Sequence, residues 1–121
     1  MNPEMMKKRT KTFAKQIIIF CRSLPNSMEG RLIGNQLFRC GTSVGANYRA
    51  ACRARSKADF IAKMGIVLEE ADETLYWVEI LQETDIIKSD LFESLKKEAN
   101  ELIAIFVSSI NTAKKAKYGS I

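Results

Sequence analysis

The chain has 121 residues, of which 46% are apolar and 27% charged, a length and composition that suit one globular domain with its own hydrophobic core. Three irregularly spaced cysteines and the absence of histidine argue against a disulfide framework and against a zinc site. The longest apolar run, Ile17 to Cys21, is far shorter than the roughly 20 residues of a membrane span, and the N-terminus lacks a signal-peptide pattern. We therefore expect a cytoplasmic protein without a membrane association.

Apolar residues recur at helical spacing along most of the chain, and no alternating strand pattern competes with them. After an N-terminal tail over residues 1–8, this spacing predicts helices over about 9–24, 28–55, 57–83 and 89–116, followed by a tail over 118–121. Side chains suited to capping stand at the last three starts: Asn26 with Glu29, Ser56 with Asp59, and Ser89 with Asp90. Short connections then predict an all-α, antiparallel up-down-up-down four-helix bundle over residues 9–117.

The second predicted helix has a packing face, a basic face and a stripe of glycines between them. The packing positions follow a bundle-like spacing of four and three: Ile33, Leu37, Cys40, Val44, Asn47 and Ala51. Because a mid-helix glycine costs about 1 kcal/mol relative to alanine, the stripe of Gly34, Gly41 and Gly45 predicts a neighbour pressed against the backbone. Asn47 is the polar exception, and we predict that Ser43 and Asn47 form a buried hydrogen-bonded pair that fixes helix register.

Charge is distributed unevenly along the chain. Residues 1–57 hold 12 Lys and Arg and two acids, whereas residues 58–121 hold seven lysines and 12 acids, so the net charges are +10 and −5. The basic side chains directed away from the packing face are candidate phosphate contacts: Arg31, Arg39, Arg49, Arg53 and Lys57. Two alternatives remain open for these arginines, namely solvated surface and ion pairs with the acidic face of a neighbouring subunit.

The outer side of the third predicted helix combines acids with large apolar residues. Glu69 and Glu73 lie there beside Trp77 and Ile80, opposite the core positions. Aromatic residues are enriched in subunit interfaces, so we predict that these four residues form an oligomer interface; cover by the N-terminal tail is the alternative. A di-metal site in such a bundle would need Glu-x-x-His pairs, and the chain has no histidine, so we expect no metal and no other cofactor.

The sequence offers little for catalysis. It contains no histidine and no Gly-rich phosphate loop, and its serines lack a paired base. Cys40 and Cys52 have arginines nearby, although apolar periodicity already explains Cys40 as a core residue. We predict that the protein is not an enzyme.

Several short motifs resemble those of one bacterial family. They are Gln36-Leu37, Arg39, the run Thr42-Ser43-Val44-Gly45-Ala46-Asn47, Arg53, Ser56, Asp59-Phe60 and Glu73-Thr74. Over about residues 10–115 the chain resembles four-helix-bundle proteins first found encoded in intervening sequences of large-subunit ribosomal RNA genes. The accessory variability protein of diversity-generating retroelements, which works with a reverse transcriptase, is similar to this group.

This resemblance implies a homo-oligomeric ring, typically a pentamer, with a proposed nucleic-acid-binding role and no catalysis. In place of an acid and a glycine that the family often has after the asparagine, this chain has Tyr48-Arg49-Ala50-Ala51, which makes the surface more basic. The leading hypothesis is a self-assembling scaffold that binds RNA or DNA without sequence specificity, with a reverse transcriptase or another protein as a candidate partner. The alternative is a protein-interaction adaptor whose charged faces serve self-assembly and acidic protein partners.

Overall fold

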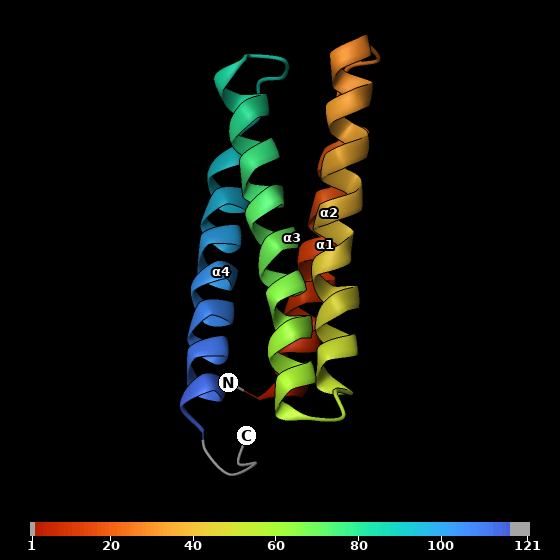
Figure 1. Cartoon of the computed structure of the whole chain (residues 1–121). Coiled ribbons are helices and arrows are strands. Elements are labelled where there is room, and N and C mark those ends of the chain that lie inside the picture. The colour runs from red at the N-terminus through yellow and green to blue at the C-terminus, as the bar shows by residue number, and fades with distance from the viewer. Residues whose placement is uncertain (1, 117–121) are drawn as a thin grey trace.

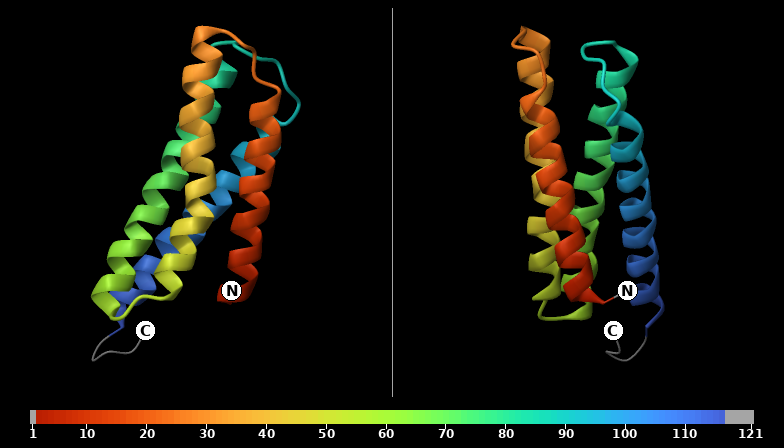
Figure 2. Two further views of the ribbon diagram at one scale, coloured as in Figure 1. Left: turned by 90° about the vertical axis from the view of Figure 1, so that its right-hand side faces the viewer. Right: turned by 180° about the vertical axis from the view of Figure 1, so that it is seen from behind.

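The computed structural model describes residues 2–116 and places them in a four-helix bundle (Figure 1). The helices are α1 (Pro3–Arg22), α2 (Met28–Cys52), α3 (Lys57–Glu83) and α4 (Phe92–Lys115). Successive helices run in opposite directions and pack side by side, with α1 and α2 on one side of the bundle and α3 and α4 on the other (Figures 1 and 2). The predicted all-α, up-down-up-down architecture is confirmed.

The hydrophobic core runs along the axis of the bundle and receives side chains from all four helices. Phe13, Phe20 and Phe106 are its largest fully buried members, and Phe20 meets Phe92 edge to face with ring centroids 5.4 Å apart. Burial of one such side chain contributes about 1.5–3 kcal/mol. This core positions the outer surfaces of α2 and α3.

The first helix begins earlier than predicted. Asn2 accepts a hydrogen bond from the Met5 backbone N–H at 2.8 Å, and Pro3 follows at the first helical position, where its missing N–H costs nothing. Met6 is 2% exposed and belongs to the core. The predicted N-terminal tail over residues 1–8 is therefore wrong from residue 3 onward, whereas the predicted tail over 118–121 lies outside the described residues.

The helices α2 and α3 start at residues 28 and 57 as predicted, whereas α4 starts at Phe92 rather than at residue 89. Ser27, not Asn26, caps α2 by accepting from the Gly30 N–H at 3.1 Å. Ser56 caps α3 as predicted, accepting from the Asp59 N–H at 3.0 Å. Ser89 instead accepts from the N–H of Leu91, so it closes a turn before α4 rather than capping it.

The predicted close neighbour of the glycine stripe is α1. A Cβ atom added at Gly41 would stand 2.8 Å from the Ile17 side chain, and one at Gly45 would stand 3.1 Å from Oγ1 of Thr10. The glycines thus let α1 and α2 approach closely, and dispersion contacts offset their helix-destabilising effect.

Ser43 and Asn47 are hydrogen-bonded to each other, but not through both side chains, and neither residue is fully buried. The Ser43 hydroxyl donates to the backbone carbonyl of Arg39 at 2.6 Å, and the Asn47 amide donates to the backbone carbonyl of Ser43 at 2.9 Å. Both side chains are half-buried and bond within their own helix, where a short polar side chain readily reaches the carbonyl one turn earlier. The register of the helices therefore does not depend on this pair.

Candidate nucleic-acid interface

Arg39, in the middle of α2, forms ion pairs with acidic residues of the same chain. Its guanidinium donates to Glu70 at 3.1 Å and to Glu73 at 2.6 Å, both on α3. The hydrogen bond with Glu73, with a smaller contribution from Glu70, raises the pKa of Arg39, and the same Arg39 hydrogen bond lowers the pKa of Glu73. Arg39 therefore joins α2 to α3 through acids of its own chain, and its role as a phosphate contact stays a prediction.

The same ion cluster accounts for two of the four residues predicted at an oligomer interface. Glu73 also accepts from the Trp77 indole N–H at 3.2 Å, and Trp77 is half-buried against the core beside Tyr76. Glu69 is exposed and Ile80 is half-buried. Glu73 and Trp77 thus have contacts within the chain, so their side chains do not by themselves require a second subunit.

The remaining predicted phosphate contacts lie in three environments. Arg31 is exposed near the start of α2 and donates to Oδ1 of Asn26 at 3.1 Å. Arg49 is exposed on the last turn of α2 and Arg53 is exposed at its C-cap, and neither forms an ion pair within the part of the chain that is described. Lys57 is half-buried at the first position of α3.

A basic corner is formed where α2 turns into α3. It consists of Arg49, Arg53, Arg55, Lys57 and Lys63, and the only acid in this stretch is Asp59. A hollow of about 550 Å³ here is lined by Arg53, Arg55 and Lys63, among others. The end of α4 lies at the same end of the bundle (Figure 1), and its last turn carries Lys114 and Lys115.

Asp59 links two members of the basic corner, Arg55 and Lys63, by hydrogen bonds. It accepts a hydrogen bond from Lys63 at 2.8 Å and another from the backbone N–H of Arg55 at 3.2 Å, and the bond from Lys63 is the main reason that its pKa is lowered. Sequence reasoning missed Arg55 and Lys63. The spacing of four between Asp59 and Lys63 was the available signal, because residues at that spacing meet on a helix.

Arg9 forms a second interhelical ion cluster that sequence reasoning missed. Its guanidinium donates to both carboxylate oxygens of Glu98, at 2.8 and 2.7 Å, and to Glu101 at 2.9 Å. The hydrogen bond with Glu98 is the largest cause of a raised pKa for Arg9. This bidentate contact joins α1 to α4 and fixes the orientation of both side chains.

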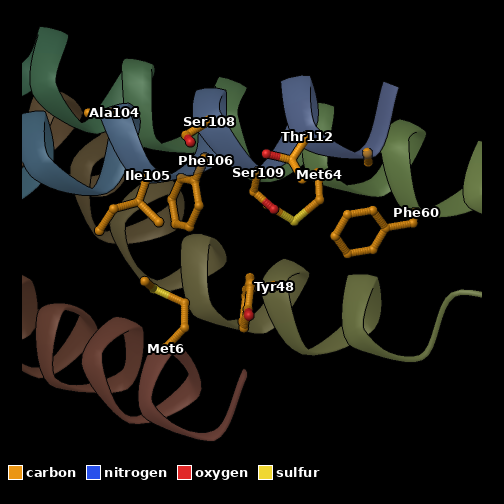
Figure 3. A pocket seen from close by; sticks show the side chains of 11 residues that line it. Met6, Tyr48, Phe60, Met64, Ala104, Ile105, Phe106, Ser108, Ser109 and Thr112 are labelled. Carbon is orange, nitrogen blue, oxygen red and sulfur yellow. The ribbon is translucent and has the colours of Figure 1, made fainter. Parts of the chain in front are cut away.

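An apolar cavity of about 620 Å³ is lined by residues of all four helices, with Met6, Tyr48, Phe60 and Met64 projecting into it (Figure 3). Among the described residues, Tyr48 is the one titratable group that lines it, and burial, followed by a hydrogen bond with Cys52, raises its pKa. The cavity lining therefore offers no pair of groups for general acid–base chemistry.

The cysteines of the core are not activated thiols. Burial raises the pKa of Cys21 to about 11 and also raises the pKa of Cys40, so both thiols remain protonated at neutral pH. Over residues 2–116, no group of three or more His, Cys, Asp or Glu side chains is placed to hold a metal ion. No helix in the described range is both long and apolar enough to cross a membrane.

These features define an α-helical bundle with a basic corner at one end. The chain belongs to the 23S rRNA-intervening sequence protein family, whose model matches residues 4–108. This confirms the resemblance seen in the sequence, and the family description names no enzymatic activity.

A solved structure supports the same assignment. It is the crystal structure of a protein of unknown function from the S23 ribosomal protein family of Bacteroides thetaiotaomicron VPI-5482. The two chains are 37% identical and superpose with a TM-score of 0.83, covering 92% of this chain and 99% of the other. A comparison with curated proteins gave no match.

Proposed function

We propose that this protein is a cytoplasmic, non-enzymatic scaffold that self-assembles and binds RNA or DNA phosphates through its basic corner. The observation that carries the proposal is the state of Arg49 and Arg53, which are exposed and have no ion pair among residues 2–116. Arg39, on the same side of α2, has two acids of its own chain. Binding is therefore assigned to the C-terminal end of α2.

The chemistry of the basic corner favours phosphate over base recognition. Guanidinium groups bind phosphate oxygens through two parallel N–H donors, and they are more weakly hydrated than ammonium groups, so they lose less hydration on binding. Within residues 2–116, the corner carries no exposed aromatic side chain on which a base could stack. We therefore expect affinity without sequence readout, as in complexes that contact only the nucleic-acid backbone.

Self-assembly would increase the affinity for nucleic acid by placing several copies of the basic corner in one particle. A ring, with five copies as the resemblance implies, would present one basic corner per subunit to the same nucleic acid. Linked sites bind more tightly than one site alone because each further contact becomes intramolecular. The opposite net charges of residues 1–57 and 58–121 support assembly between unlike surfaces.

The test is a titration of labelled RNA hairpin and duplex DNA with purified protein at several salt concentrations between about 50 and 200 mM. The wild-type protein should bind both, and its affinity should fall steeply with salt because bound counterions are released. The double variant Arg49→Glu/Arg53→Glu should lose at least about tenfold in affinity, since two phosphate contacts are replaced by repulsion.

The matched control is Lys11→Glu/Lys15→Glu, which changes the net charge by the same amount on exposed positions of α1. This control should retain most of the affinity. Equal losses in both double variants would show that only total charge matters and would overturn the assignment to the corner. Absence of binding at the lowest salt would overturn nucleic-acid binding itself and favour an adaptor for acidic proteins.

A further inference from the structure

A groove of about 430 Å³ lies between α3 and α4. Its apolar lining includes Ile61, Leu68 and Val107. Its charged lining consists of Glu69 and Asp72 on α3 and Lys114 on α4. Val107 is 40% exposed, and Ile66, next to the groove, is 46% exposed. Apolar and acidic groups are thus left uncovered on the side of the bundle formed by α3 and α4.

Gly65 lines this groove and differs from every other described glycine. A Cβ atom at Gly30, Gly34, Gly41 or Gly45 would come within 3.1 Å of another atom of the chain, whereas a Cβ at Gly65 would have nothing within 4 Å. The chain therefore supplies close neighbours that explain four of its helical glycines but supplies none for Gly65. A glycine in the middle of a helix is unfavourable, so its exposed backbone fits a site where another molecule approaches closely.

The first half of α2, on the opposite side of the bundle, exposes complementary groups. Met28, Leu32 and Phe38 are 66%, 59% and 46% exposed, and Arg31 is exposed among them. Arg31 gives this surface a positive charge, whereas the groove lining holds two acids, Glu69 and Asp72, and one lysine, Lys114. Apolar groups flanked by opposite charges are available on the two sides.

We propose that the α3–α4 groove receives the Phe38 face of α2 from a second copy of the chain, with the helix of that copy seated against Gly65. This inference rests on the self-assembly stated in the proposed function and names its surfaces. The two surfaces are different, so each copy uses one toward each neighbour, and such a head-to-tail contact closes into a ring or continues as a filament. The interface is therefore centred on Gly65 and Phe38 rather than on Glu73 and Trp77, which have partners in their own chain.

Two single substitutions test this contact from its two sides. Gly65→Leu places a side chain in the groove at a position where a Cβ atom has nothing within 4 Å, and Phe38→Asp removes the exposed ring and adds a charge that Glu69 and Asp72 repel. Thr12→Leu adds an exposed leucine on α1 and is the control. Light scattering after gel filtration should give an oligomer for the wild type and the control, and the 13.7 kDa mass of one chain for both variants.

Mixing the two variants distinguishes a head-to-tail contact from other modes of assembly. Gly65→Leu retains an intact α2 face and Phe38→Asp retains an intact groove, so an equal mixture should form dimers of twice the single-chain mass and nothing larger. Circular dichroism should show the same helix content in all variants, because both changed positions are exposed or open.

The outcomes separate this inference from the proposed function. A monomeric wild-type protein would overturn self-assembly and the inference with it. A wild-type oligomer that persists in Gly65→Leu and Phe38→Asp would overturn the inference and leave self-assembly standing. Monomeric variants that give no dimer on mixing would overturn the pairing of these two surfaces.

Discussion

The middle of α2 and its C-terminal end carry similar residues in different surroundings. In the middle, Arg39 has Glu70 and Glu73 of α3 as partners, and Gly41 has Ile17 of α1 against its backbone. Toward the α2–α3 turn, Arg49 and Arg53 form no ion pair within residues 2–116. Beyond that turn, on α3, a Cβ atom added at Gly65 would have nothing within 4 Å. The comparison teaches that the same residue type holds the fold where the chain provides its partner and is available to another molecule where it does not.

The largest effect that the comparison predicts concerns the glycines. Gly41→Leu should lower the free energy of unfolding by about 3 kcal/mol, because the new side chain collides with Ile17 in a packed contact between α1 and α2. Gly65→Leu should not destabilise the monomer. Urea denaturation of both variants measures the difference, and equal losses would show that the two glycines do not differ in their surroundings.

A smaller change at Gly65 should stabilise the chain. Gly65→Ala replaces a poor helix former by the best one at an open position, so the unfolding free energy of the monomer should rise by about 1 kcal/mol. Denaturant titration at protein concentrations too low for assembly measures this gain. A loss of stability would mean that the open space at Gly65 is needed by the isolated chain.

Arg39 and the basic corner should separate in their effects on stability and binding. Arg39→Gln should lower the midpoint of thermal unfolding, because Glu70 and Glu73 lose their shared partner, yet should leave the affinity for nucleic acid within about twofold. Arg49→Gln should instead lower the affinity for nucleic acid and leave the midpoint of thermal unfolding nearly unchanged. Thermal melts and salt titrations on the same samples test the pair, and a tenfold loss of affinity in Arg39→Gln would restore it as a phosphate contact.

The bundle was predictable from sequence because its signal is local. The packing positions of α2, from Leu37 to Ala51, repeat with helical spacing whatever lies opposite them. The start of α1 was also predictable, since Asn2 is an N-cap residue and Pro3 suits the first helical position. The basic residues that follow suggested a solvated tail instead.

The candidate site was less predictable because it depends on helix register. Whether Arg39 meets Glu73 is decided by how α2 slides against α3, and these residues are separated by a turn and many positions in sequence. The openness of Gly65 likewise depends on which atoms surround it in three dimensions. Periodicity assigns a residue to a face of its helix, but packing decides whether that face has a partner.

Acid should reveal the Arg39 cluster through the pH dependence of stability. The pKa of Glu73 is lowered in the folded chain from an ordinary value of 4.5, so its stabilising effect is present above about pH 4.5 and is lost as pH falls through the folded-state pKa. Glu73→Gln should reduce this dependence, whereas Glu69→Gln, at an exposed position without an ion pair in residues 2–116, should keep the wild-type profile. Thermal midpoints measured from pH 7 downward test this, and an unchanged profile in Glu73→Gln would show that the contact between Arg39 and Glu73 does not stabilise the bundle.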